Sequence, residues 1–110
     1  EKSISEISRI LKKGGVLIAT FPFYTNRYET HVKATLDQEG KVHHLTEPEY
    51  HGNPVDPEGG SLVFQVPGWQ FLEVCRSNGF SEAKMYFLSS EDAGIVSADM
   101  NGVIIFMAEI

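Results

Sequence analysis

The feature that most limits the fold of this chain is a mostly apolar run, Val16 to Phe21, which Pro22 ends. The run does not alternate with polar residues, and this is typical of a strand covered on both faces in a parallel sheet flanked by helices. Proline ends such a strand because it has no N–H to donate to a neighbouring strand. We therefore expect the run to belong to a sheet with partners on either side.

The residues before this run predict a helix. Apolar side chains recur at helical spacing between residues 4 and 11, and Lys12-Lys13 suits the negative end of a helix dipole. Gly14-Gly15 then stops the helix, because glycine readily adopts the left-handed conformation that closes a last turn.

The second half of the chain predicts a helix from Pro67 to Gly79, a strand over 82–88, a loop over 89–101 and a buried strand over 102–110. The last two strands are joined without a helix, so we expect them to be antiparallel neighbours.

Residues 24–60 differ in character from the rest. Two strand-like runs flank the tight turn 37–40 and predict a β-hairpin, in which residue 34 should lie opposite residue 43. The stretch 46–60 is rich in proline and glycine and predicts an ordered, irregular loop. A loop of this length in a compact domain is usually functional or disordered, and its aromatic and histidine content favours function.

Composition sets the class of protein. With 110 residues, 42% hydrophobic and 22% charged, the chain is expected to be a single globular domain over residues 1–110 with an insertion at 24–60. A net charge of −6 with scattered basic residues argues against nucleic-acid binding. The single cysteine excludes an internal disulfide framework and fits a reducing cytoplasm, and no apolar run is long enough to span a bilayer.

The order helix, strand, insertion, helix, strand, strand predicts an α/β fold. The first strand and the following helix form a βα unit, which should lie on a mostly parallel sheet.

At this point three segments are similar to one known family. EISRILKKGGVLIATFPF (6–23) resembles the segment entering the fifth strand of class I S-adenosylmethionine-dependent methyltransferases of the type 11/12-like kind. GWQFLEVCRSNGF (68–80) resembles the helix after that strand, and GVIIFMAEI (102–110) resembles the seventh strand. The stretch PEYHGNPVDPEGGSLVF (48–64) resembles a feature of family members that act on small molecules.

The resemblance implies a partial Rossmann-like sheet, with equivalents of strands five, six and seven, the last antiparallel between the other two. The resemblance covers only the carboxy-terminal half of the domain found in that family. The glycine-rich loop that cradles the cofactor has no counterpart, because Lys12 to Gly15 precede a strand, whereas such loops follow one. We therefore expect a fragment that binds no S-adenosylmethionine by itself, although the intact enzyme would use it.

Ligands of open α/β sheets bind outside the carboxyl ends of the strands, which places Phe21 and Phe23 as candidate substrate-binding residues. Burial in the core is an equally good interpretation of both aromatic side chains. The long loop adds Tyr50 and Asn53 as candidate substrate contacts, because loops on a scaffold often carry specificity.

His51 is the candidate catalytic residue. Methyl transfer often needs a base to take a proton from the acceptor, and an imidazole titrates near neutrality. The alternative is that His51 hydrogen-bonds within its own loop.

Other chemistry is less well supported by the sequence. His43 and His44 are adjacent in a predicted strand and point to opposite faces, so no metal site is predicted. Cys75 lies on the apolar face of a helix and is expected to be inert, and Trp69 is expected to pack against the insertion. Four acids in polar loops are interpreted as solvated charges: Asp56, Glu58, Glu91 and Asp92.

Two functions follow as hypotheses. The first is the substrate-side part of a methyltransferase for a small-molecule acceptor. The alternative is a non-catalytic protein-interaction module, whose hairpin and loop bind a partner. In either case an unpaired apolar edge at Val16 to Phe21 predicts self-association, as in a homodimer.

Overall fold

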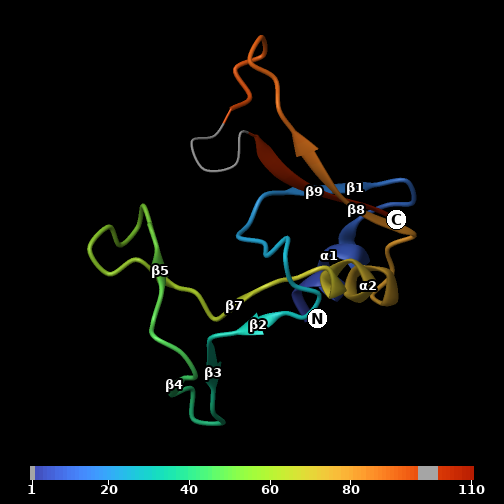
Figure 1. The fold of residues 1–110 in the computed structure, drawn as a ribbon. Coiled ribbons are helices and arrows are strands. Elements are labelled where there is room, and N and C mark those ends of the chain that lie inside the picture. Colours follow the sequence, from blue (N-terminus) through green and yellow to red (C-terminus); the bar gives the residue numbers. More distant parts are fainter. Residues whose placement is uncertain (1, 97–101) are drawn as a thin grey trace. The chain divides into compact units, whose positions relative to one another are not determined.

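The computed structural model describes residues 2–96 and 102–110. Figure 1 shows the elements, and the chain divides into two compact units. The first unit comprises Glu1–Phe21 and Phe71–Ile110, and the second unit comprises Pro22–Gln70. The predicted insertion, residues 24–60, falls within the second unit.

The first unit contains a three-stranded sheet in the order β1-β9-β8 (Figure 1). Its strands are β1 (Val16–Ala19), β8 (Glu82–Leu88) and β9 (Val103–Glu109). The last strand in sequence is the central one, and it runs antiparallel to both neighbours. The predicted antiparallel pairing of the last two strands is confirmed.

Two helices cover one face of this sheet, namely α1 (Lys2–Ile10) and α2 (Gln70–Ser77) (Figure 1). Alternate residues of the strands turn towards them, because side chains on a strand point to opposite faces in turn. The buried core consists of Cys75, Phe80, Ala83, Phe106 and Ala108.

The predicted end of the second helix is confirmed. Gly79 has a φ of 102°, in the left-handed region, and the N–H of Phe80 returns to the carbonyl of Cys75 at 3.3 Å. Phe80 is then buried against the last turn of α2, as expected for a helix closed by glycine and a following apolar residue.

The predicted fold class, an α/β fold with a partial Rossmann-like parallel sheet, is wrong. The described strands form four small sheets in which every pair is antiparallel, alongside two short helices. β1 is also not covered on both faces, because Leu17 and Ala19 face the core while Val16 and Ile18 are 43% and 67% exposed. An apolar strand without polar alternation is thus half-exposed in this sheet.

The second unit consists of three two-stranded antiparallel sheets. β2 (His31–Val32) pairs with β7 (Gln65–Val66), β3 (Ala34–Leu36) with β4 (Val42–His44), and β5 (Tyr50–His51) with β6 (Ser61–Leu62). The stretch 46–60, predicted to be irregular, therefore contributes one strand, β5, to a ladder.

The predicted hairpin is present, but its register was wrong by one residue. Thr35 lies opposite His43, and Ala34 lies opposite His44. The reason is the turn, in which the N–H of Asp37 bonds the carbonyl of Lys41 at 3.0 Å and leaves three residues in the loop. The last of these is Gly40, with a φ of 82°, as expected for a three-residue hairpin loop.

The predicted loop over 89–101 lies only partly within the described residues. In the part that the structure describes, Ser90 and Ile95 form an isolated antiparallel bridge around a turn at residues 91–94. Residues 97–101 lie outside the described residues.

Candidate functional site

The two candidate phenylalanines are packed in different units. Phe21 lies in the first unit, with its ring centroid 5.2 Å from that of Phe71 and 5.6 Å from that of Phe106. Phe23 lies in the second unit, edge-on to Trp69 at 5.1 Å. The indole N–H of Trp69 donates to the carbonyl of Thr25 at 2.8 Å, so this side chain does pack on the insertion, as predicted.

The candidates of the long loop are placed on or next to β5. Tyr50 and His51 are both exposed, and they point to opposite sides because they are consecutive in a strand. The side-chain oxygen of Asn53 accepts from the N–H of Val55 at 3.0 Å, and its carbonyl accepts from the N–H of Asp56 at 3.1 Å. Asn53 therefore shapes the turn after β5.

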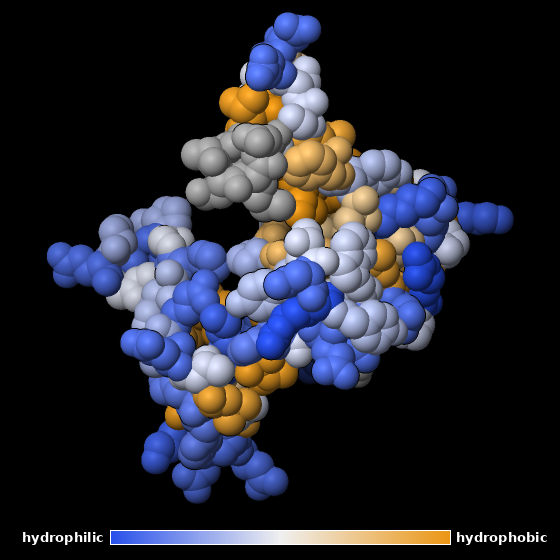
Figure 2. Space-filling view, in the orientation of Figure 1, coloured by the Kyte–Doolittle hydropathy of each residue, from blue (hydrophilic) through white to orange (hydrophobic). Residues whose placement is uncertain are grey.

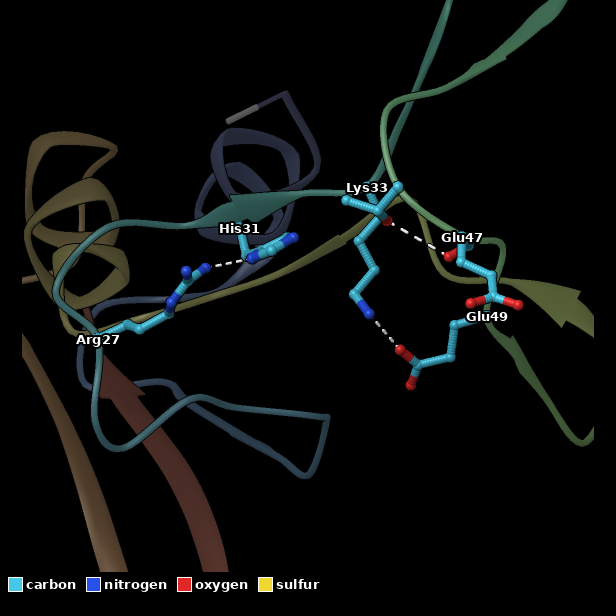
Figure 3. Close-up of polar contacts among 6 residues, drawn as sticks. Arg27, His31, Lys33, Glu47 and Glu49 are labelled. Carbon is cyan, nitrogen blue, oxygen red and sulfur yellow. Dashed lines mark hydrogen bonds and ion pairs between the residues drawn. The ribbon is translucent and has the colours of Figure 1, made fainter.

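A group of polar side chains that the sequence did not predict centres on Lys33 and Glu49 in the second unit, and His51 acts on Glu49 electrostatically. Lys33 forms an ion pair with Glu49, which Figure 3 shows. Glu49 lies two positions before His51 on the same extended segment, since the N–H of Val63 bonds the carbonyl of Glu49 at 2.9 Å and prolongs the β5–β6 ladder. Glu49 and His51 therefore share one side of that segment.

The positions of Lys33 and Glu49 are set by the backbone around them. The N–H of Lys33 donates to the carbonyl of Phe64 at 2.7 Å, and its own carbonyl accepts from the N–H of Leu45 at 2.8 Å. Lys33 thus joins the residue that follows the hairpin to the segment between β6 and β7. Its side chain is only 13% exposed, against 45% for that of Glu49.

The electrostatics of the cluster follow from these contacts. The hydrogen bond to Glu49 is the main cause that raises the pKa of the Lys33 ammonium, and the phenol of Tyr24 adds to this rise. The loss of hydration on burial lowers the same pKa but does not outweigh the rise. The bond to Lys33 is in turn the main cause that lowers the pKa of Glu49, and the nearby His51 lowers it further. Glu49 is therefore a carboxylate at neutral pH, paired with Lys33 and with the electrostatic influence of His51 as a smaller cause.

This arrangement can support proton transfer at His51. An exposed imidazole can take a proton from a bound hydroxyl or amine, and a carboxylate on the same side stabilises the imidazolium that forms. Lys33 keeps Glu49 in place and ionised, and Tyr24 completes the cluster. We call Tyr24, Lys33, Glu49 and His51 the proton-transfer cluster.

Other reactive side chains serve structural roles. Burial raises the pKa of the Cys75 thiol to about 11, so it is a thiol rather than a thiolate at neutral pH, as expected for an inert core residue. Asp56 accepts from the N–H of Gly59 at 3.0 Å within a turn. Glu58, Glu91 and Asp92 are exposed, as expected for solvated charges.

The described residues contain neither a group of metal ligands nor a membrane-spanning helix. In residues 2–96 and 102–110, no three His, Cys, Asp or Glu side chains gather as potential metal ligands. Neither of the two described helices is long and apolar enough to cross a membrane.

Comparison with known proteins adds no assignment. The chain matches no protein-family model, no curated protein and no solved structure.

Proposed function

We propose that this chain is the carboxy-terminal, substrate-side part of a cytoplasmic S-adenosylmethionine-dependent methyltransferase for a small-molecule acceptor. The observation that carries the proposal is the strand order β1-β9-β8, in which the last strand lies antiparallel between the other two. The sequence resemblance implied this placement of the last strand. The fold class that it also implied is excluded above, so the proposal concerns the function only.

The residues of this chain do not fit S-adenosylmethionine on their own. The glycine pairs 14–15 and 59–60 each come directly before a strand, β1 and β6, whereas a cofactor-cradling loop follows a strand and opens a helix. The cofactor would have to be held by residues outside this chain, and we assign no residue here to it.

His51 supplies the proton-transfer step of the proposal. In this role the imidazole accepts the proton of the acceptor's nucleophile, and Glu49 holds the resulting imidazolium by its negative charge. The exposure of His51 leaves it accessible to an acceptor. Tyr50 points to the opposite side of β5 and Phe23 packs on Trp69, so we assign no acceptor contact to either aromatic side chain.

The experiment compares the product of the complete reading frame that contains this sequence with the isolated 110-residue chain. Using cofactor labelled on its methyl group and a panel of small hydroxyl and amine acceptors, we expect label transfer by the complete protein and none by the isolated chain. His51→Gln should lower the rate of the complete protein by about 10²–10⁴-fold, the usual contribution of a general base.

His44→Gln is the matched control, because His44 is also an exposed histidine of the second unit and lies outside the proton-transfer cluster. It should leave the rate unchanged. If the complete protein neither binds S-adenosylmethionine nor transfers label, the proposed function is wrong.

The second candidate function is a protein-interaction module. It is favoured by large apolar side chains of the second unit that face water: Val55 is 92% exposed, Leu45 60% and Leu36 58%. Exposed apolar groups of this kind favour contact with a partner protein. Cofactor binding by the complete protein separates the two candidates, because an interaction module has no need for it.

A further inference from the structure

The segment Arg27–Glu29 of the second unit is held close against Gly68. The N–H of Trp69 donates to the carbonyl of Arg27 at 3.1 Å, and the N–H of Gln70 donates to that of Tyr28 at 2.8 Å. The carbonyl oxygens of all three residues approach Gly68 so closely that a Cβ there would lie 2.7 Å from each. The backbone that carries Arg27 is therefore fixed.

The side chain of Arg27 is also oriented. Its guanidinium carbon lies 5.7 Å from the centroid of the Tyr24 ring, within the range of a cation–π contact. Its Nη1 lies in hydrogen-bonding contact with Nδ1 of His31, as Figure 3 shows, and the Tyr24 and His31 rings meet edge-on at 6.0 Å. Arg27 thus rests between two aromatic rings.

Among the described residues, Arg27 forms no ion pair with a carboxylate. A guanidinium can only donate, so Nδ1 of His31 is the acceptor in this contact. Lys33 differs, because its ammonium is paired with the carboxylate of Glu49. The remaining N–H groups of an exposed guanidinium form a planar fork, which matches the two oxygens of a carboxylate or a phosphate.

A pocket lies beside this charge. It has a volume of about 300 Å³ and is lined by Arg27, Tyr28, Glu29 and Thr30. Its size is at the lower end for small-molecule sites. The lining offers the guanidinium of Arg27 and the hydroxyl of Thr30 as donors, and it has one acid, Glu29, whose negative charge opposes an anion.

We propose that this pocket binds a small oxyanion, a carboxylate or phosphate group, with Arg27 as the main contact and His31 as its positioning residue. The oxyanion lies against the guanidinium fork, and Tyr24 and His31 keep the fork in one orientation. The proposal does not depend on methyl transfer, because the pocket and its charge are present in this chain alone.

The test uses the 110-residue chain and titrates it with sodium phosphate, sodium acetate and neutral acetamide, at an ionic strength kept constant with chloride. Binding is followed by the amide shifts of residues 24–33 in nitrogen–proton correlation spectra. Trp69, the only tryptophan of the chain, reports independently through its fluorescence, because its N–H bonds Arg27. We expect saturable shifts with one or both anions and none with acetamide.

The variants separate a site from general charge attraction. Arg27→Gln should weaken anion binding about tenfold or more, the usual effect of losing a charged hydrogen bond. Lys41→Gln removes the same charge from the hairpin of the same unit, outside the pocket lining, and should have little effect. Glu29→Gln should strengthen binding, because it removes the opposing charge from the lining.

Each outcome either supports or overturns the oxyanion site. Saturable shifts confined to residues 24–33 support the site, and preference for acetate or for phosphate identifies the class of oxyanion. Shifts that do not saturate, or equal losses for Arg27→Gln and Lys41→Gln, would overturn it. If Arg27→Gln does not fold, as its own spectrum would show, the location of the wild-type shifts and the sign of the Glu29→Gln effect still decide.

Discussion

At the scale of single residues, Gly68 is the position where the second unit tolerates least change. It is buried, and a Cβ at this position would meet the backbone carbonyls of Arg27, Tyr28 and Glu29 at 2.7 Å each. Backbone atoms cannot move aside as a flexible side chain can. We expect Gly68→Ala to lower the free energy of unfolding by more than about 1 kcal/mol, the level at which an incompatible glycine substitution exceeds its entropic gain.

The measurement is urea unfolding followed by the fluorescence of Trp69, which lies in the same unit. Gly52→Ala is the matched control, because Gly52 has open space around its Cβ position and lacks a positive φ. The control should be neutral or slightly stabilising. An equal effect of the two substitutions would contradict the close approach at Gly68.

A second prediction at this scale concerns acid. The side-chain bond from His43, at 2.8 Å, is the first cause that lowers the pKa of Asp37 below its ordinary value, and the N–H of Lys41 is the next. A depressed pKa means that the contribution of Asp37 to hairpin stability is complete above the pKa of the unfolded chain. It is lost as the pH falls through the lower pKa of the folded chain.

The amide shifts of residues 34–44, recorded from neutral pH down to strong acid, should therefore show the hairpin loosening over this acidic range. Asp37→Asn should weaken the hairpin at neutral pH and flatten that dependence. Glu39→Gln removes another acid from the same turn and should leave the pH dependence of the hairpin unchanged. The same profile in Asp37→Asn and the wild type would show that another group is responsible.

The residues of the candidate site differ in how far the sequence could predict them. His51, Tyr50 and Asn53 could be named as candidates from the sequence because they lie within four positions of one another in an aromatic loop, and their roles in a site stay predictions. Lys33 and Glu49 were missed because their contact joins residues sixteen positions apart. It depends on the ladders β2–β7 and β5–β6, which are only two residues long and leave little hydrophobic pattern in the sequence.

At the scale of elements, the aromatic contacts of β9 hold the first unit together. Phe106 is 1% exposed, and its ring lies 5.1 Å from that of Phe71 and 5.6 Å from that of Phe21. It thus joins the central strand to α2 and to the end of the β1 segment. Phe106→Ala should lower the free energy of unfolding by about 3–5 kcal/mol, as for other buried phenylalanines.

Hydrogen exchange of the β8 and β9 amides measures this loss. Phe87→Ala in the neighbouring strand is the control, since Phe87 is 57% exposed and has less contact to lose. It should accelerate exchange much less. If the two variants exchange equally fast, the aromatic cluster is not what holds the sheet on its helices.

Elements with strong local signals were predicted and others were not. The end of helix α2 and the bounds of strand β8 were confirmed, because a glycine stop marks the one and a partly alternating run of seven residues marks the other. The predicted helix start at Pro67 was too early, because α2 begins at Gln70. The predicted coverage of β1 on both faces was wrong, because apolar residues on both sides of a strand show that the strand is apolar and do not show that both faces are buried. Only the tertiary contacts show that the Val16 and Ile18 side is uncovered.

At the scale of the whole molecule, the outer face of the first unit's sheet is apolar and open. Ile18, Tyr86, Leu88, Ile105 and Met107 line a shallow hollow there. Figure 2 shows apolar side chains at the surface over β8 and β9. A surface of this kind favours association with another protein chain.

The two edges of this sheet differ in how well they are protected against association. Edge strand β8 carries the ion pair of Lys84 and Glu82, with Nζ 2.6 Å from the carboxylate, on its outer face. Edge strand β1 reads Val-Leu-Ile-Ala and has no charge. Charged residues on an edge strand oppose pairing with another chain, so β1 is the edge at which a second copy should pair.

We expect the isolated chain to self-associate as its concentration rises, which sedimentation velocity and light scattering measure. Ile18→Lys gives β1 the charge that β8 already has, and because Ile18 is 67% exposed the substitution should leave the fold intact. Val55→Lys, at a 92% exposed position of the second unit, is the control and should still associate. A wild-type chain that stays monomeric at every concentration, or an Ile18→Lys variant that associates like Val55→Lys, would exclude β1 as the interface.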